Sequence, residues 1–477
     1  MADTDNIIDT NTLAEETTAS LNPLHLPEIV AHLGYFLKPK DLLNALLVNR
    51  TWHTLLGPFL WIVTRFHSRW VSTKLRTRNP SGETLRRNAH LIRYLTCPGL
   101  QFINHLLPRC CNLQELELSA LGPIVVPLLN QNANSLKSLK QTAMFPHLNG
   151  DIISKWGFFT AIASLTQLRE LHLEYLEIPA RELYMFLKTC AQITTLHLRI
   201  CRWTISEPQL DAVDFEHIQT MSLLKNVQTP MQELKFFTRC PSLRSLVWWV
   251  SGKFTKDERP HIHELLSSRA GNLRTFAIHT TTLDDNDIAT CIEALPTLPN
   301  LNLSGSSLGK HTVQAILGRI SNLVELDLCS CKHLPRGFLQ QILASCPNLE
   351  SFAADYYNVK MPLSTPWPCT HLQSLRLSFV SFIKEAITTE EYDWIYGQLA
   401  ALTYLKLLQI GEVHVPSLAP INIMELSLAK GFGQLKTLTK LEGLWVGNMY
   451  RGLGTAESTW IKEHLPLATV YLPCNPE

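Results

Sequence analysis

The sequence predicts an α/β fold in which a small N-terminal helical unit precedes a curved solenoid, with a parallel sheet on the solenoid's concave face. Three observations lead to this prediction. A leucine pattern, Leu-x-x-Leu-x-Leu, recurs from about residue 92 to the end of the 477-residue chain. The pattern returns about every 25 residues, the length of one strand plus one helix. Residues 22–62 instead space their apolar side chains as a helix does.

Composition limits the classes of protein to consider. The chain is longer than one compact core usually organises, so it divides into domains or extends as a solenoid. Its 42 Lys and Arg nearly balance 41 Asp and Glu, so we expect neither nucleic acid nor a membrane as a partner. We find no transmembrane run and no secretory signal, and therefore expect a cytoplasmic or nuclear protein. The 12 cysteines are then expected to be reduced thiols.

The chain divides into four segments. Residues 1–21 carry acidic and polar side chains with few apolar ones, so we expect a disordered tail. Residues 22–63 form the helical unit, residues 64–91 a basic junction, and residues 92–477 the solenoid. We interpret the junction as a solvated joint, with contact to an acidic partner as the alternative.

The helical unit is predicted from three- and four-residue spacing. Ile29, Leu33 and Leu37 fall four apart and share one face of a helix. Pro39 is expected to interrupt this helix, and Asp41 is expected to cap the next one. A unit of about 40 residues rarely folds alone, so it needs a partner or a neighbouring domain.

The repeats resemble leucine-rich repeats, and about sixteen copies can be matched loosely. The clear copies begin at Leu113, Leu168, Ile193, Leu323, Leu372 and Leu402, and weaker ones include those at Leu298 and Ile423. Residues 141–164 and 253–269 are longer gaps, which we expect to be surface insertions. Cysteines such as Cys240 and Cys346 come just before the strands, where a small thiol buries easily.

Alternation along each strand sends the leucines inward and their neighbours to the concave face. Charged and aromatic side chains on one continuous face suit protein binding, so we predict a substrate-binding surface there. A solvated face without a dominant contact is the alternative. The predicted contact residues are Glu117, His172, His197, Arg199, Trp249, His279, Asp327, Asp355, Arg376, Lys406 and Trp445.

No motif predicts catalysis, a metal or a cofactor. Cys329 and Cys331 lack a second pair at the spacing of a zinc site. His261 and His263 lie in a gap that we expect to be a loop, and we interpret them as exposed. We find neither a phosphate-binding glycine loop nor a nucleophile elbow. An enzyme with an unrecognised site remains the weakest alternative.

The helical unit resembles an F-box of the fungal type. The resemblance depends on Leu24-His25-Leu26-Pro27-Glu28-Ile29, followed by Leu33, Leu37, Asp41-Leu42, Val48-Asn49, Trp52 and Leu60-Trp61. Pro27 and Glu28 are adjacent, whereas many F-boxes have an extra residue between them. With its cysteine-containing repeats, the whole chain is similar to F-box/leucine-rich-repeat proteins.

The resemblance implies a substrate-recognition subunit of a Skp–cullin–F-box type ubiquitin ligase. The helical unit would dock onto the Skp-type adaptor, and through it onto a cullin–RING ligase, while the repeats would bind a protein substrate. The residues that it places at or near the adaptor are Leu24, Leu26, Pro27, Ile29, Leu33, Leu37 and Leu42. The alternative is a leucine-rich-repeat interaction scaffold unrelated to ubiquitination, whose N-terminal helices cap the solenoid.

Overall fold

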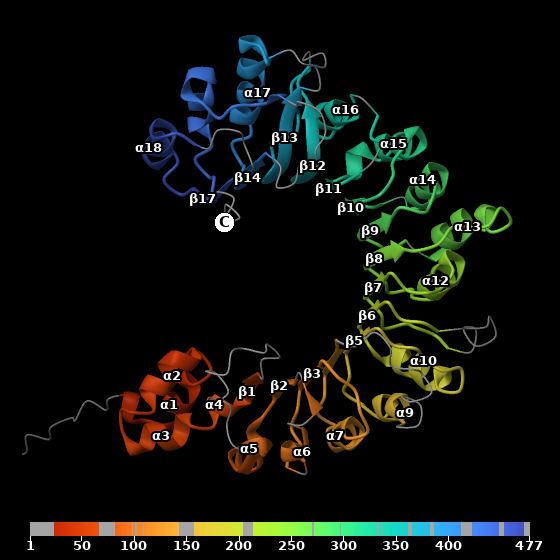
Figure 1. Cartoon of the computed structure of the whole chain (residues 1–477), viewed down its shortest axis with the longest axis vertical. Helices are drawn as coiled ribbons and strands as arrows, with labels where there is room; N and C mark the ends of the chain where they lie inside the picture. Colours follow the sequence, from red (N-terminus) through yellow and green to blue (C-terminus); the bar gives the residue numbers. More distant parts are fainter. Residues whose placement is uncertain are drawn as a thin grey trace, which may run out of the picture.

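The computed structural model describes residues 23–471 with internal gaps. The gaps are residues 66–81, 98, 101–102, 108, 143–156, 204–212, 270, 296, 332, 336, 361–364, 382–385, 412–421 and 448–452. Figure 1 shows a helical unit at one end of an arc whose inner side is lined by strands and whose outer side is covered by helices. The fold confirms the predicted α/β solenoid with N-terminal helices.

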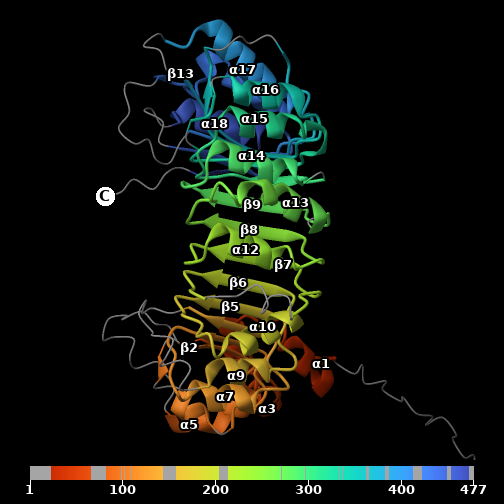
Figure 2. The same cartoon turned by 90° about the vertical axis from the view of Figure 1, so that its right-hand side faces the viewer.

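The strands described form one sheet of 17 members. All neighbours pair in parallel except β15, which pairs antiparallel with β13 and leaves β14 to pair with β16. Figure 2 shows the strands stacked like rungs along the long axis of the arc. The strands are β1 (Val63–Arg65), β2 (Tyr94–Cys97), β3 (Glu115–Leu118), β4 (Ser138–Gln141), β5 (Glu170–Glu174), β6 (Thr195–Arg199), β7 (Thr220–Leu224), β8 (Ser245–Val250), β9 (Thr275–Thr280), β10 (Asn300–Asn302), β11 (Glu325–Leu328), β12 (Ser351–Asn358), β13 (Ser374–Ser381), β14 (Leu407–Ile410), β15 (Asn422–Ile423), β16 (Gly443–Val446) and β17 (Thr469–Tyr471).

Helices cover the outer side of the sheet (Figure 1). A helix is about 10 Å wide whereas parallel strands lie about 4.8 Å apart, so the sheet must curve with its strands inside. The α-helices are α5 (Gly82–Asn88), α6 (Ile103–Leu106), α7 (Val125–Gln131), α9 (Phe158–Ala163), α10 (Leu183–Gln192), α12 (Pro230–Phe237), α13 (Arg259–Arg269), α14 (Asp285–Glu293), α15 (Lys310–Leu317), α16 (Phe338–Ser345), α17 (Thr389–Ala401) and α18 (Thr455–His464). The 3₁₀ helices are η1 (Pro23–His25), η3 (Ala89–Leu91), η5 (Ile320–Asn322), η6 (Leu428–Lys430) and η7 (Phe432–Thr437).

One continuous apolar core fills the space between strands and helices. Inward side chains of successive strands lie at the same register, as Leu116 does beside Leu139 and Leu139 beside Leu171. All three are buried, and so are the thiols of Cys240 and Cys346. Each repeat therefore buries its leucines against the repeats before and after it.

Several strands are followed by a residue whose backbone is in the left-handed helical conformation. Tyr175, Ile200 and Lys225 follow β5, β6 and β7 at equal spacing, and each has a φ between 52° and 55°. This conformation costs about 1–2 kcal/mol in a residue other than glycine. The Tyr175 and Ile200 N–H groups donate to the carbonyls of Arg199 and Leu224 at 2.9 and 2.8 Å, which offsets part of that cost.

The helical unit comprises α1 (Pro27–Leu33), α2 (Pro39–Ala45), α3 (Arg50–Leu56) and α4 (Phe59–Ile62). Val30, Leu42, Ala45 and Leu56 form an apolar core of its own, separate from that of the solenoid. Helix α4 runs directly into β1, and Trp61 packs against the solenoid core. The unit is thus joined to the arc through α4 but packed within itself.

One local prediction for the helical unit was wrong. Asp41 does not cap a helix, because α2 already begins at Pro39 and Asp41 lies in its first turn. Proline suits the first helical position since the missing N–H has no partner there. The side chain that caps a helix is Asn49, whose Oδ1 accepts the N–H of Trp52 at 2.8 Å.

The gap at residues 253–269 is not a loop, since most of it forms α13 and His261 and His263 lie on that helix. In the other gap, residues 143–156 lie outside the described residues and Phe158–Ala163 form α9. The tail at residues 1–21 also lies outside them. Within the segment 64–91, the structure describes the end of β1, helix α5 and η3.

The repeat copy at Leu402 was assigned out of phase. The buried residues are Leu402, Leu405, Leu408 and Ile410, so the strand pattern begins at Leu405, and Leu407 is exposed. Leucines three apart at the end of α17 imitate the start of the pattern. The copy assigned at Ile423 is not a parallel strand either, because the chain forms the short antiparallel β15 there.

Candidate functional site

The first candidate surface lies on the helical unit. Leu24, Leu26, Pro27 and Ile29 expose their side chains on η1 and the start of α1. Leu33 and Leu37 are half-buried, and Leu37 packs against the core of the unit. Leu42 is only 3% exposed, so its side chain supports this surface from inside and does not reach a partner.

The same unit exposes a second apolar group that sequence reasoning missed. Tyr35 and Phe36 are each 72% exposed, and Leu47 is 85% exposed. Leu43 and Val48 are also exposed. Leu43 lies on α2 and Leu47 in the turn that follows it, and the two form an exposed stripe beside the one that buries Leu42. The four-residue spacing of Leu43 and Leu47 could have predicted this stripe from the sequence, but only the stripe that contains Leu42 was predicted.

Trp52, on α3, holds η1 in place. Its indole Nε1 donates to the Leu24 carbonyl at 3.3 Å, while its ring packs against the core residues of the unit. Gly34 lies against the Phe59 ring, where a Cβ would come within 2.7 Å. These contacts fix η1 and α1 on α3 and α4, so the exposed leucines are held in a defined arrangement.

The second candidate surface is the concave face of the sheet. Because the register is parallel, each strand places the same repeat position beside that of its neighbour. The central ladder reads Thr96, Glu117, Lys140, His172, His197, Ser222, Val247, Ala277, Asn302, Asp327, Ala353, Arg376, Gln409, Trp445 and Tyr471. Six predicted contact residues lie on this ladder: Glu117, His172, His197, Asp327, Arg376 and Trp445.

The ladder is most polar at β3–β6. The rings of His172 and His197 lie 5.4 Å apart on adjacent strands. His172 Nε2 is 3.1 Å from Glu174 Oε1, and Arg199 Nη1 is 3.4 Å from the same oxygen. These residues adjoin two hollows of about 540 and 450 Å³, which share Glu117 and Lys140 in their walls.

Burial and the neighbouring His172 ring lower the pKa of His197. The His197 imidazole is therefore neutral at physiological pH, since a neutral ring avoids both the loss of hydration and repulsion from a cation nearby. A neutral imidazole both donates and accepts a hydrogen bond. This part of the concave face thus offers polar contacts with mixed charge.

The trailing edge, where the strands end, carries aromatic and basic side chains. Trp249 and His279 have ring centroids 5.8 Å apart, and Lys225 Nζ lies 4.0 Å from the centre of the Trp249 ring. Arg199 lies in the same row at the end of β6. Trp249 remains exposed, so its outer face is open to a partner.

The C-terminal half of the concave face is acidic and then aromatic. Asp327 and Asp355 lie near Arg376, and burial raises the pKa of Asp355. Both carboxylates accept backbone N–H groups, Asp327 from Cys329 and Asp355 from Ser330. Further along, the ring of Trp445 stacks on that of Tyr471 with centroids 4.3 Å apart.

Lys406 does not lie within a strand, because β14 begins at Leu407. Its N–H pairs with the Gln373 carbonyl, which places it at the leading edge, where the strands begin. The structure therefore brings the predicted concave residues into several separate groups rather than one site, and Lys406 belongs to none of them.

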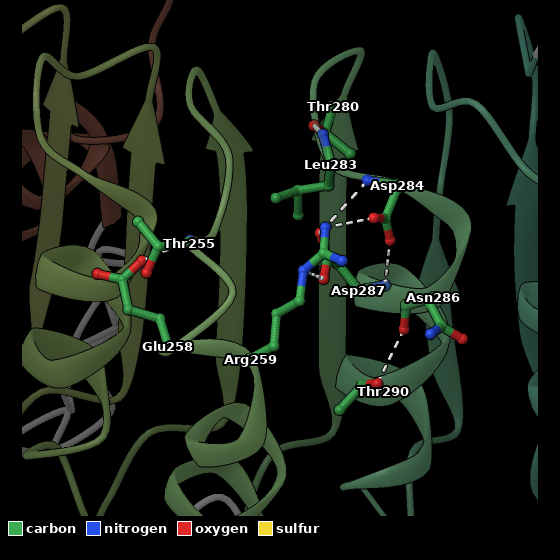
Figure 3. Close-up of polar contacts among 9 residues, drawn as sticks. All are labelled: Thr255, Glu258, Arg259, Thr280, Leu283, Asp284, Asn286, Asp287 and Thr290. Atoms are coloured by element: carbon green, nitrogen blue, oxygen red, sulfur yellow. Dashed lines mark hydrogen bonds and ion pairs between the residues drawn. The ribbon is translucent and has the colours of Figure 1, made fainter.

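A polar network on the helical side ties two repeats together (Figure 3). At the start of α13, the Arg259 guanidinium contacts Asp284, and its Nε lies 3.0 Å from Asp287 Oδ1. Asp284 and Asp287 also form the capping box at the start of α14. Arg259 contacts both carboxylates from the neighbouring repeat, so we interpret the network as a structural bridge.

The described residues offer little to catalytic chemistry. Burial raises the pKa of the thiols of Cys190, Cys201 and Cys240, which disfavours the nucleophilic thiolate. Within the described part of the chain, no group of three or more His, Cys, Asp or Glu side chains is arranged to hold a metal ion. No described helix is long and apolar enough to cross a bilayer.

Comparisons with known proteins find a likeness of fold only. No protein-family model and no curated protein matches the chain. A leucine-rich-repeat protein of Leptospira interrogans matches with a TM-score of 0.42 and 17% identity, over 81% of this chain and 97% of that one. An internalin of Listeria monocytogenes matches with a TM-score of 0.40 and 14% identity, over 66% and 83%. Matches this distant do not transfer a function.

Proposed function

We propose that this chain is a non-catalytic adaptor that joins two other proteins. The helical unit docks onto the Skp-type adaptor of a cullin–RING ubiquitin ligase, and the concave face of the solenoid binds the protein to be ubiquitinated. The chain contributes proximity, since holding both partners makes their encounter effectively intramolecular.

One observation carries this proposal. The helical unit has its own core, yet it leaves apolar side chains exposed along η1, α1, α2 and the turns between and after them. These include Leu26, Tyr35 and Leu47. Apolar side chains gathered on one small unit are typical of protein-binding surfaces. A partner that covers them would also stabilise a unit too short to be robust alone.

The alternative is an interaction scaffold whose N-terminal helices cap the solenoid. Its support is the continuous path from α4 into β1 and the packing of Trp61 against the solenoid core. Deleting residues 1–62 distinguishes the two, because it removes the whole helical unit together with α4 and Trp61. A cap predicts a lower melting temperature for the solenoid, whereas a docking unit predicts little change.

Direct binding tests the proposal. The purified chain is titrated with a purified Skp-type adaptor, alongside a variant with Leu26→Ala and Ile29→Ala. We expect at least about tenfold weaker binding in the variant, since truncating buried apolar contacts in an interface costs about 1 kcal/mol or more each.

The matched control removes exposed apolar side chains from the solenoid, with Tyr184→Ser and Val227→Ser. Both residues are more exposed than Leu26. The control should bind the adaptor as the wild type does. No binding by the wild-type chain, or an equal loss in the control, would contradict docking through the helical unit.

A further inference from the structure

A hollow of about 450 Å³ lies at the leading edge of the sheet across β7–β10. Its polar walls come from Gln219, Ser242, Arg244, Asn272, Arg274 and Thr297, and no acidic residue lines it. Its volume falls within the range of ligand-binding pockets. None of these residues belongs to the contact set predicted from the sequence.

The two arginines of this hollow occupy equivalent positions on adjacent strands. The Arg244 N–H donates to the Gln219 carbonyl at 2.8 Å, and the Arg274 N–H donates to the Arg244 carbonyl at 2.8 Å. Their backbones are therefore about 4.8 Å apart. Two cations at neighbouring positions repel each other, and an anion bound between them would relieve that repulsion.

Neither guanidinium has a counter-charge nearby. Among the described residues, neither Arg244 nor Arg274 forms a side-chain ion pair or hydrogen bond. Both side chains are exposed. Their donors are therefore free to bind a ligand.

Strands β7–β10 themselves carry no carboxylate on the concave face. The sequence has no Asp or Glu between Glu216 and Glu233, between Glu233 and Asp257, between Glu264 and Asp284, or between Glu293 and Glu325. Strands β7, β8, β9 and β10 fall one in each of these four stretches. At the far end of the same strands, the Lys225 ammonium lies over the Trp249 ring. Basic side chains at both ends of these strands and the lack of a carboxylate on them favour an anionic ligand here.

A second pair of basic residues, at the same position in earlier repeats, does have carboxylates beside it. Lys137 and Arg169 precede β4 and β5, and the Arg169 N–H donates to the Lys137 carbonyl. Glu115 and Glu170 lie next to them at the start of β3 and β5. Arg169 Nη1 also donates to the carbonyls of Leu168 and Gln192. The charge of this pair is locally balanced and its donors are partly used.

We propose that Arg244 and Arg274 bind carboxylate side chains of an acidic segment in the protein held on the concave face. This inference rests on the proposed function, because it names the chemistry of the substrate that the solenoid binds. Guanidinium groups suit the role, since their planar donors pair with carboxylates in a bidentate manner. The neutral side chains Ser242, Asn272 and Thr297 supply hydrogen bonds to the backbone of that segment.

The test measures peptide binding by the purified full-length chain. The probe is a short fluorescein-labelled peptide of alternating Glu and Ser, and binding is followed by fluorescence anisotropy. We expect salt-sensitive binding that weakens about tenfold or more in the variant with Arg244→Gln and Arg274→Gln, because two charge-assisted contacts are lost. The variant with Arg244→Lys and Arg274→Lys keeps the charge and should retain part of the affinity.

The matched control is Lys137→Gln with Arg169→Gln, which removes equal charge at the same register and should change binding less than about twofold. Circular dichroism melts establish that all variants fold. Three results would overturn the proposal: a peptide with Gln in place of Glu that binds equally well, equal losses in the two double variants, or binding only by a phosphoserine version of the peptide. Peptide binding needs no ubiquitin-ligase partner, so failure here and failure of adaptor docking are separate results.

Discussion

The helical unit and the solenoid bury their apolar side chains to different degrees. In the solenoid, inward residues such as Leu326 are 1% exposed because the repeats on both sides cover them. In the helical unit, four residues form the core while Tyr35, Phe36 and Leu47 remain largely exposed. A repeat has neighbours on two sides, whereas the helical unit lies at one end of the arc and joins it through α4. The unit therefore keeps a second apolar surface that the described part of the chain does not cover.

The largest effect is expected from a core leucine of the solenoid. Leu326 lies beside Leu301 and Phe352 on the neighbouring strands. Leu326→Ala should lower the free energy of unfolding by roughly 2–5 kcal/mol, because the rigid neighbours leave a cavity. Urea denaturation followed by circular dichroism measures the loss. A loss below about 1 kcal/mol would mean that the repeats do not cover one another as closely as their burial indicates.

The next prediction concerns a buried acid that exists in the solenoid core but not in the core of the helical unit. Burial raises the pKa of Glu233 to about 7, against hydrogen bonds from Trp248 and Asn226 that lower it. The Trp248 Nε1 donates to Glu233 Oε2 at 2.7 Å. In the unfolded chain the same group ionises near its ordinary value. Between those two pKa values the folded state binds more protons, so stability falls as pH rises.

Glu233→Gln should remove this part of the pH dependence. The difference in unfolding free energy between wild type and variant should fall by about 3 kcal/mol as pH rises from about 4.5 to 7. Urea denaturation at several pH values gives that difference, and other titrating groups cancel in it. A difference that stays constant with pH would show that Glu233 is solvated in the folded state.

Burial of the leucine ladder could be predicted from sequence because it follows one period. The parallel register carries each inward leucine next to its equivalent, so Leu116, Leu139 and Leu171 were assigned correctly without knowledge of the arc. The period fails where other leucines imitate it. Leucines recur every three residues from Leu399 to Leu408, across the end of α17. The strand pattern was therefore assigned three residues too early there.

The candidate sites were harder to predict, because exposure depends on how elements pack. The helical stripe that includes Leu42 was recognised as apolar, but only the fold shows that it faces the core and that Leu47 faces solvent. Likewise, alternation placed His172 and His197 on the concave face, yet Arg244 and Arg274 precede their strands and fall outside that alternation. Their proximity comes from the register between repeats, which a single repeat does not reveal.

A moderate effect is expected where one repeat caps the next. The carboxylate of Asp285 accepts the N–H groups of Gly309, His311 and Thr312 at 2.7–3.0 Å. Gly309 has no side chain to cap α15, so Asp285 of the preceding repeat does so. Asp285→Ala should lower the unfolding free energy by about 1–2 kcal/mol, as the loss of a helix cap does.

The control is the neighbouring Asn286→Ala, which leaves those three N–H groups capped and should change stability by about 0.5 kcal/mol or less. Thermal melts compare the two variants. Equal shifts would show that contact between neighbouring repeats contributes no more here than local helix preference. A larger shift for Asp285→Ala supports the contrast with the helical unit, whose Asn49 caps a helix of the same unit.

The smallest effect on stability is expected from the exposed stripe of the helical unit. Leu47 is 85% exposed, so Leu47→Ser removes little buried surface and should change the free energy of unfolding by about 0.5 kcal/mol or less. Leu42→Ala, five residues earlier and 3% exposed, should destabilise the unit by roughly 2–5 kcal/mol. Hydrogen exchange of the amides in α1–α3 under native conditions, which reports on the unit separately from the solenoid, measures both. Equal destabilisation by Leu47→Ser and Leu42→Ala would mean that the chain itself covers the exposed stripe. The helical unit would then bury its apolar side chains as completely as the solenoid does.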